Sequence, residues 1–374
     1  MRITNKMMIN NSIYWLSKQA ERLSDAEIVS ASGQVINKPS DDPAGAAKIL
    51  EYRSAISKYD QYQTNIDQAN TYIETGENVL DSVDSLLDEA IDYATEMASG
   101  AGDYTETYLS SIKDIYNSII DLANTTYGSD YMYGGTDTDS TPFSDEIALS
   151  SGSADIGFYL GDDASTVTFT IYDSDGNECG TYTTSGTAGS NTLSWDGSVT
   201  LEDGTTTTLS DGDYTFGITA SDSSGNAIAS SCYQGDDGDK TMYISDSSTI
   251  KINRTGGEIF TEALSAISQL IAGLETGDDE TIESCASAAT ESLDTALDNI
   301  KTERVALSNI YASLDVSSDR VDALSELLSE KLSAIETGDT TEAAVELSAQ
   351  ETAYEIATEA AAKILNLPKL SDYI

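Results

Sequence analysis

The chain has 374 residues, 39% of them hydrophobic, and its 18 basic against 65 acidic residues give a net charge of −47. Such an acidic surface repels phosphate backbones and excludes nucleic acid as a partner. Histidine is absent, so Ser–His and Cys–His catalytic pairs are excluded, and no apolar run is long enough to span a membrane. The length allows roughly two or three domains.

Residues 1–36 carry scattered apolar positions among Asn, Ser and Lys, which predicts a weakly amphipathic helix that is marginal alone. The first thirty residues lack a basic head followed by an apolar core, so we expect no Sec signal peptide. Four cations in this segment are open to two interpretations, an export signal or a solvated helix face: Arg2, Lys6, Lys18 and Arg22.

A proline-bracketed segment follows, made of Pro39, Ser40, Asp41, Asp42 and Pro43. Two prolines interrupt any helix that approaches from the N-terminal side. Pro43 suits the first turn of the next helix, and Asp41 or Asp42 suits its N-cap.

The stretch from Tyr52 to Met97 is a sustained heptad repeat. Its a positions are Tyr52, Tyr59, Ile66, Ile73, Leu80, Leu87 and Ala94, and its d positions are also apolar or small. A repeat of this length predicts one straight helix whose seam meets another long helix.

A shorter helix is expected over residues 105–126, folding back antiparallel, and residues 127–143 are expected to form a loop with a short strand. From about 149 to 230 the chain turns to Gly, Ser, Thr and Asp with alternating apolar residues, as in Val167, Phe169 and Ile171. Short alternating strands separated by turn residues are typical of a β-sandwich. Further strands are expected between Tyr233 and Asn253.

Helical patterns return at 258–274 and in a second heptad segment whose apolar a positions include Leu307, Leu314, Val321, Leu328 and Ile335. This segment, 286–335, is the expected partner of the first long helix. Its d positions are weaker: Ala289, Ala296, Ile310 and Leu324 are apolar, but Glu303, Ser317 and Lys331 are not. We expect these last three to face solvent or a neighbouring subunit. A last helix is predicted after Thr340.

At both ends the sequence resembles the hook-associated protein 3 (hook–filament junction) family of flagellin-like axial proteins. The motifs that carry the resemblance are Met1–Thr4, Ile36–Asn37, Pro39–Pro43, Ala46–Leu50, Tyr59–Ile66, Tyr233–Asp236, Ile244–Asp246, Asn253, Gly257–Phe260, Ala361–Leu367 and Leu370–Ile374. Flagellin shares the terminal helices, but the prolines of the Pro39–Pro43 motif and the Asp372-Tyr373-Ile374 ending favour the junction family. The insert resembles the immunoglobulin-like domain of the flagellar hook-capping protein, through Asp175-Gly176-Asn177, Trp195-Asp196-Gly197 and Asp211–Phe216.

The resemblance implies a mainly α fold of long antiparallel coiled-coil helices from both termini, with an inserted β-sandwich and a small mixed β region. It divides the chain into terminal helices that order on assembly (1–44 and 341–374), a long helical bundle (45–127 and 257–340), a small β region (128–148 and 231–256) and an immunoglobulin-like sandwich (149–230). It implies an extracellular structural protein of the flagellum that forms a ring with its own copies. The implied partners are the first hook-associated protein, flagellin, an export chaperone and the type III export apparatus.

The implied site is an assembly seam, with no catalytic, cofactor or metal residues. The seam comprises Tyr59, Ile66, Ile73, Leu80, Leu87, Leu307, Leu314, Val321, Leu328 and Ile335, and the family motif comprises Pro39, Ser40, Asp41, Asp42, Pro43, Asp372 and Tyr373. The alternatives are a flagellin-like filament subunit and an adhesin-like binding module carried by the insert.

Other interpretations of single motifs stay open at this level. The Asp173–Glu178 loop, the Asp211/Asp213 pair and the Asp236–Asp239 segment could offer oxygens to calcium, although tight turns need the same residue types. Trp195 and the tyrosines could form a carbohydrate-binding patch. Cys179 and Cys232 could form a disulfide, and a carboxylate pair is the one remaining enzyme hypothesis.

Overall fold

The computed structural model describes residues 5–100 and 105–365, and the chain divides into two compact units. Unit 1 comprises Met1–Gln63 and Asp319–Ile374, and unit 2 comprises Thr64–Ser318. The two ends of the chain therefore belong to one unit, and the middle of the chain forms the other.

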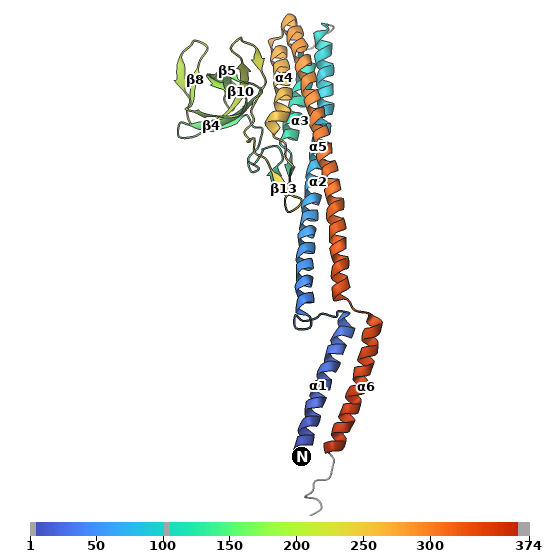
Figure 1. Cartoon of the computed structure of the whole chain (residues 1–374). Coiled ribbons are helices and arrows are strands. Elements are labelled where there is room, and N and C mark those ends of the chain that lie inside the picture. The colour runs from blue at the N-terminus through green and yellow to red at the C-terminus, as the bar shows by residue number, and fades with distance from the viewer. Residues whose placement is uncertain (1–4, 101–104, 366–374) are drawn as a thin grey trace, which may run out of the picture. The chain divides into compact units, whose positions relative to one another are not determined.

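The helices in chain order are α1 (Asn5–Ser32), α2 (Pro43–Ala98), α3 (Thr105–Ala123), α4 (Gly256–Thr276), α5 (Asp279–Glu336) and α6 (Thr340–Leu365) (Figure 1). The two long heptad patterns lie inside α2 and α5, as predicted. Helix α3 ends at Ala123, so Thr126 is not helical as expected but begins a short strand.

In unit 1, α1 packs beside α6. The linkers that leave the two helices are joined by backbone hydrogen bonds: the Val35 N–H donates to the Glu336 carbonyl at 2.8 Å, and the Gly338 N–H donates to the Gly33 carbonyl at 3.1 Å. These bonds satisfy main-chain groups that have no partner inside a helix. The two arms of the chain are thus tied together where both change direction.

In unit 2, α2 and α5 run antiparallel, with α3 and α4 packed beside them. Arg304 of α5 bridges Asp81 and Asp84 of α2, while a Cβ placed on Gly76 would lie 3.7 Å from Leu307 Cδ1. Residue numbers rise along one helix as they fall along the other. The core of this bundle contains large side chains that are completely buried, among them Ile66, Leu80, Leu87, Ile112 and Ile119.

The insert is a β-sandwich of two antiparallel sheets. Its strands are β3 (Glu146–Leu149), β4 (Ala154–Leu160), β5 (Ala164–Tyr172), β6 (Glu178–Gly186), β7 (Gly189–Trp195), β8 (Ser198–Thr200), β9 (Thr206–Thr208), β10 (Gly212–Ser221), β11 (Ala227–Ile228) and β12 (Ser230–Ser231). One sheet has the order β11-β10-β5-β6-β8-β9 with β3 beside β10, and the other has the order β12-β4-β7. The sandwich begins at Glu146 rather than at residue 149, because β3 pairs with β10.

Alternating residues of both sheets fill the sandwich core, including Phe158, Val167, Phe169, Ile171 and Trp195. Trp195 is only 1% exposed, and its indole N–H donates to the Ser198 carbonyl at 2.8 Å. It is therefore a core residue, and the interpretation of Trp195 as part of a carbohydrate-binding surface is wrong. Cys179 and Cys232 are free thiols, so the disulfide considered above does not form.

The small β region consists of two hairpins. Strand β1 (Thr126–Tyr127) pairs with β2 (Asp130–Tyr131), and β13 (Thr241–Tyr243) pairs with β14 (Thr249–Lys251). Both hairpins lie on the segments that carry the chain from the helices into the sandwich and back.

Candidate functional site

The predicted seam is a continuous buried contact in unit 2. Ile66, Leu80, Leu87 and Leu314 are completely buried, and Ile73 and Leu307 are nearly so. Burying a leucine side chain stabilises the fold by roughly 2–3 kcal/mol. These seam residues therefore stabilise the long helices within the chain and leave little surface there for a partner.

Two of the three polar d positions of α5 differ from expectation. Ser317 is only 7% exposed, and its hydroxyl donates to the Ser313 carbonyl at 2.8 Å. Glu303 is half-buried and forms an ion pair with Arg254, which lies between β14 and α4, at 2.9 Å. The expectation that Ser317 and Glu303 face solvent or a neighbour is wrong, because a local hydrogen bond and an ion pair satisfy them; Lys331 is exposed as expected.

The seam is looser in unit 1. Val321 is buried, but Tyr59, Leu328 and Ile335 are only half-buried. Leu50 and Leu327, which are also in this unit, are 64% and 46% exposed. Unit 1 consequently keeps apolar surface on its helices that its own residues do not cover.

The proline-bracketed motif forms the entry to α2, and two aspartates there have different tasks. The Asp41 carboxylate accepts from the Lys38 N–H at 2.8 Å and from the Asn37 N–H at 3.2 Å, which holds the turn before the helix. The Asp42 carboxylate accepts from the Ala44 N–H at 3.0 Å, and Pro43 occupies the first helical position. Asp42 is therefore the N-cap. Asp372 and Tyr373 lie outside the described residues.

The terminal helices α1 and α6 bury very little. Of their described side chains only Ala361 is among the buried residues, and the contact includes a hydrogen bond between the side chains of Gln19 and Gln350. Both helices display large apolar side chains to solvent: Met7, Ile13, Tyr14, Trp15, Ile28, Val345 and Ile356. A helix pair that exposes this much apolar surface is an incomplete bundle.

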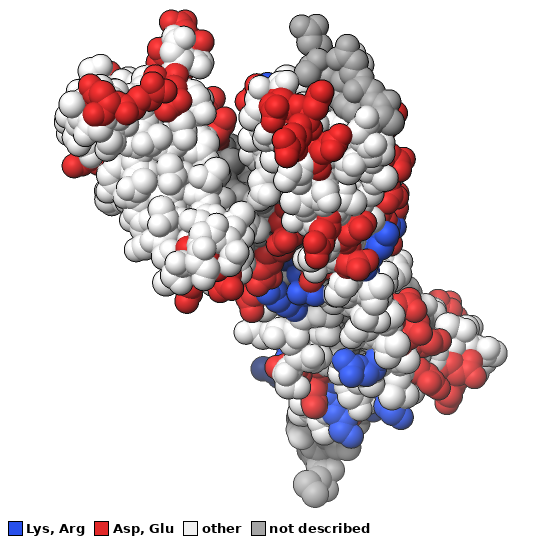
Figure 2. Space-filling model, turned by 90° about the horizontal axis from the view of Figure 1, so that it is seen from above, with Lys and Arg blue, Asp and Glu red and all other residues white. Residues whose placement is uncertain are grey.

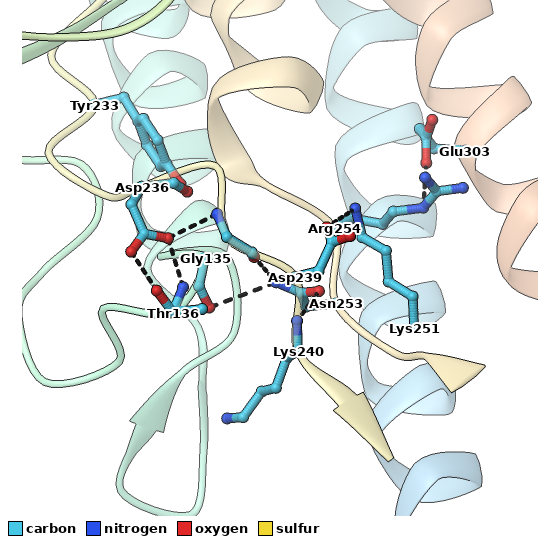
Figure 3. Close-up of polar contacts among 11 residues, drawn as sticks. Gly135, Thr136, Tyr233, Asp236, Asp239, Lys240, Lys251, Asn253, Arg254 and Glu303 are labelled. Carbon is cyan, nitrogen blue, oxygen red and sulfur yellow. Dashed lines mark hydrogen bonds and ion pairs between the residues drawn. The ribbon is translucent and has the colours of Figure 1, made fainter. Parts of the chain in front are cut away.

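The segments that enter and leave the sandwich are joined in unit 2 by a set of contacts that we call the strand clamp (Gly134–Thr136, Tyr233–Gly238 and Asn253). The Tyr233 hydroxyl donates to the Tyr133 carbonyl at 2.9 Å. The Asp236 carboxylate accepts from the Thr136 N–H at 2.6 Å (Figure 3). Gly135 has a φ of 75°, and a Cβ there would lie 2.1 Å from the Asp236 carbonyl oxygen. Glycine is required at Gly135 because the two chain segments approach so closely.

Asn253 is the second anchor of the clamp. It is completely buried; its side-chain oxygen accepts from the Lys240 N–H, and its amide donates to the Gly238 carbonyl, both at 2.8 Å. Burial raises the pKa of Tyr133 and Tyr233, so both hydroxyls stay protonated and able to donate. The clamp holds together the segments through which the chain enters and leaves the insert.

The roles of the clamp residues were not predicted. Two of their hydrogen bonds, Thr136 to Asp236 and Tyr233 to Tyr133, join positions 100 residues apart, and local periodicity carries no information about such pairs. The one signal in the sequence was the resemblance of Tyr233–Asp236 and Asn253 to the strand region of the junction family.

The acidic turns are explained by their own hydrogen bonds. The Asp173 carboxylate accepts from the N–H groups of Asp175 and Asn177 at 2.9 and 2.8 Å, which lowers its pKa, mainly through the side chain and backbone of Asn177. Asp222 repeats this arrangement with Ser224 and Asn226. Within residues 5–100 and 105–365, no group of three or more His, Cys, Asp or Glu could hold a metal ion.

Three family models match the chain. The bacterial flagellin N-terminal helical region matches residues 3–138, the FlgD Ig-like domain matches 144–229, and the bacterial flagellin C-terminal helical region matches 290–371. The first and third fall on the helices that enter and close the fold, and the second falls on the sandwich.

Single relatives and solved structures are also similar to the chain. A flagellin from Clostridium tyrobutyricum is 28% identical over 130 residues, which is 34% of each chain, so the chain spans about a third of the length of this curated relative. A putative flagellar hook-associated protein from Vibrio parahaemolyticus is similar in structure, with a TM-score of 0.50 and 17% identity over 79% of this chain and 100% of that one. FlgL from Bacillus cereus has a TM-score of 0.43 and 15% identity over 78% and 99% of the two chains.

The fold and the family models define a structural protein with flagellin-type ends. The chain belongs to the flagellin-like family of bacterial flagellar proteins and carries a hook-capping-type immunoglobulin-like domain between its two helical halves. The family is structural rather than enzymatic. Among residues 5–100 and 105–365, no helix combines the length and the apolar character needed to cross a bilayer.

Proposed function

We propose that the chain is a ring-forming adaptor at the junction between hook and filament. In this role it contacts its own copies laterally, the first hook-associated protein on one side and flagellin on the other. It reaches this place, outside the cell, through an export chaperone and the type III export apparatus.

The observation that carries the proposal is the incomplete pair of α1 and α6. The pair exposes Trp15 to 64%, Ile13 to 57% and Val345 to 67%, while burying only Ala361 among its described side chains. Short helices with so little buried surface gain stability when another surface covers them. Neighbouring copies of the same pair would supply that surface, and the seam of unit 2, already buried, would remain the rigid support.

A flagellin-like filament subunit is the second candidate, and the similarity to the Clostridium tyrobutyricum flagellin favours it. Both candidates use the terminal helices, so these helices do not separate the two. The candidates differ in whether assembly stops after one ring or continues.

Truncation tests the role of the terminal helices. We expect that removing residues 1–36 or 345–374 leaves a folded, soluble protein that no longer assembles onto isolated hooks. A double variant, Ile13→Ser with Trp15→Ser, should reduce assembly without truncation, whereas the matched variant Asn11→Ser with Ser17→Ala on the same helix should not. If the trimmed proteins assembled onto hooks as the full chain does, this mechanism would be wrong.

A further inference from the structure

The outer edge of strand β7 is open over Asn191–Trp195, whereas the backbone N–H of Ser190 is bonded to the Asp237 carboxylate. Strand β7 has seven residues and pairs only with β4. The other edge strands of the sandwich are shorter, with four residues in β3, three in β9 and two each in β11 and β12. The backbone of Asn191–Trp195 makes no backbone hydrogen bond on its other side within the described chain.

An open edge of this length is a template for pairing with another strand. A second copy of the chain offers the same strand, and two β7 strands could pair antiparallel about Thr192, the central residue. Folded proteins usually prevent this with lysine, proline or a bulge in the edge strand. Strand β7, with the sequence GSNTLSW, contains no charged residue and no proline, and its register with β4 is uninterrupted.

Carboxylates line this strand from neighbouring segments. Asp163 accepts from the Ala188 N–H at 2.9 Å, just before β7 begins, and Asp237 accepts from the Ser190 hydroxyl at 2.8 Å. Asp155 accepts from the Ser194 hydroxyl at 2.6 Å, and Asp196 directly follows the strand. All four aspartates are exposed. The bonds above hold Asp155, Asp163 and Asp237 beside β7, and the Ser198 N–H, which donates to Asp196 at 3.0 Å, holds the fourth.

No cation on the sandwich neutralises these four aspartates. Residues 144–231 contain fourteen Asp and Glu and no Lys or Arg, and the sequence has no Lys or Arg at all between Lys113 and Lys240. The charged side chains on the face of the sandwich seen in Figure 2 are accordingly Asp and Glu. Two copies brought edge to edge at β7 would bring two identical acidic borders together, and like charges at a contact oppose association.

We propose that the four aspartates at β7, Asp155, Asp163, Asp196 and Asp237, form an electrostatic guard that keeps sandwiches of neighbouring copies from pairing through their open edges. The guard goes beyond the junction role, because it acts on any two copies that approach, in solution or in an assembly. It allows a chain that assembles through other surfaces to carry an open strand without joining copies at the insert.

Disulfide trapping in the full chain detects the pairing of two β7 strands from different copies and no other contact. In an antiparallel β7 pair centred on Thr192, the two substituted residues of a Thr192→Cys variant would be opposite each other at a Cβ separation of about 5 Å, which suits a disulfide. The native Cys179, Cys232 and Cys285 can also form disulfides between copies. The dimer yield of the chain without Thr192→Cys is therefore measured as the background. The guard is then removed by Asp155→Asn, Asp163→Asn, Asp196→Asn and Asp237→Asn on the Thr192→Cys chain.

With the guard intact and little salt, we expect a covalent dimer yield at the background level. Neutralising the four aspartates should raise the yield roughly tenfold or more, because the like-charge penalty is removed. A matched set away from β7, Glu146→Gln, Asp175→Asn, Glu178→Gln and Asp213→Asn, removes the same charge and should leave the yield near background.

Raising the salt concentration provides a second test, in which the four aspartates are left unchanged. At about 1 M salt the screening length falls to roughly 3 Å, so the Thr192→Cys chain alone should form more dimer. Two results would overturn the proposal: a yield that neither neutralisation nor salt raises, or an equal rise with the matched set, which would show that net charge rather than the β7 border controls the contact.

Discussion

Arg53 of α2 and Glu336 at the end of α5 form an ion pair at 2.5 Å, although 283 positions separate them. The Glu336 side chain is only 9% exposed and also accepts from the Gln34 side chain, while Arg53 is half-exposed. Asp and Glu are unfavourable at a helix C-terminus, so Glu336 needs these donors. The pair joins the beginning of one long helix to the end of the other, beside the bonded linkers of unit 1.

Removing the arginine should therefore weaken unit 1. Arg53→Ala leaves a buried carboxylate with one donor fewer, and we expect a loss of about 1–2 kcal/mol in the free energy of unfolding of this unit. Amide hydrogen exchange along residues 45–60 measures the loss locally. Lys48→Ala, which removes an exposed cation from the same stretch of α2, should change amide exchange by much less. Equal effects would mean that the loss of one positive charge, rather than the loss of the ion pair with Glu336, causes the faster exchange.

The N-cap of α2 makes a separate contribution. Asp42→Ala should cost about 1 kcal/mol, because the Ala44 N–H loses its acceptor and the helix N-terminus loses a favourable negative charge. Faster exchange of the amides in the first turn of α2 would show this loss of stability. Ser40→Ala changes a neighbouring exposed residue and should leave these amides protected; an unchanged first turn in Asp42→Ala would contradict the assignment of the cap.

Of the changes that we predict, those in the buried seam have the largest effect on the free energy of unfolding. Leu80→Ala removes a completely buried side chain in unit 2 and should cost about 3 kcal/mol of unfolding free energy. Val316→Ala on α5, where the valine is 68% exposed, should stay within about 0.5 kcal/mol of the parent. Urea denaturation followed by helical circular dichroism separates the two, and similar costs would show that the seam is not where the stability resides.

Alkaline pH should destabilise the fold through Cys232. Burial raises the pKa of this thiol from its ordinary value of 9.0 to about 12, mainly by desolvation. Below pH 9 the thiol is neutral in both states and its contribution is fully present. Above pH 9 the unfolded chain ionises first, so stability falls by about 1.4 kcal/mol per pH unit until the folded thiol also ionises near pH 12.

A Cys232→Ala variant isolates this effect from the buried tyrosines. The variant loses some packing at every pH, but its stability should decline less than that of the parent as pH rises. Between pH 9 and 10.5 the gap between the two should narrow by about 2 kcal/mol. Parallel stability curves over this range would mean that the Cys232 thiol does not titrate as its burial requires.

Periodicity predicted the helical part of the fold well because long helices are specified locally. Every seventh residue from Tyr52 is apolar or small, and the side chains from Ile66 onward are buried or nearly so in α2. The expectation that polar d positions face solvent failed at Ser317 and Glu303. Ser317 donates a hydrogen bond to the Ser313 carbonyl, and Glu303 forms an ion pair with Arg254, so both are satisfied inside the fold. Such partners depend on tertiary contacts that spacing does not reveal.

The sandwich was predicted as a class but not in its pairing. Alternation in Val167–Ile171 indicated a strand, yet the partner strand β10 lies more than forty residues away. The hydrogen bonds of Asn253 and Asp236 in the clamp, and the open edge at β7, depend on which strands become neighbours. The assembly residues in the terminal helices remain a prediction, because their role depends on contacts with other copies of the chain.

The most direct test of the junction role is assembly on isolated hooks that carry the first hook-associated protein. Purified full-length chain is added in excess, and the hook ends are examined by electron microscopy before and after flagellin is supplied. We expect one discrete ring at each hook end, no further growth without flagellin, and filament growth from that ring once flagellin is added. Long filaments formed by this chain alone, or hook ends left bare, would contradict it.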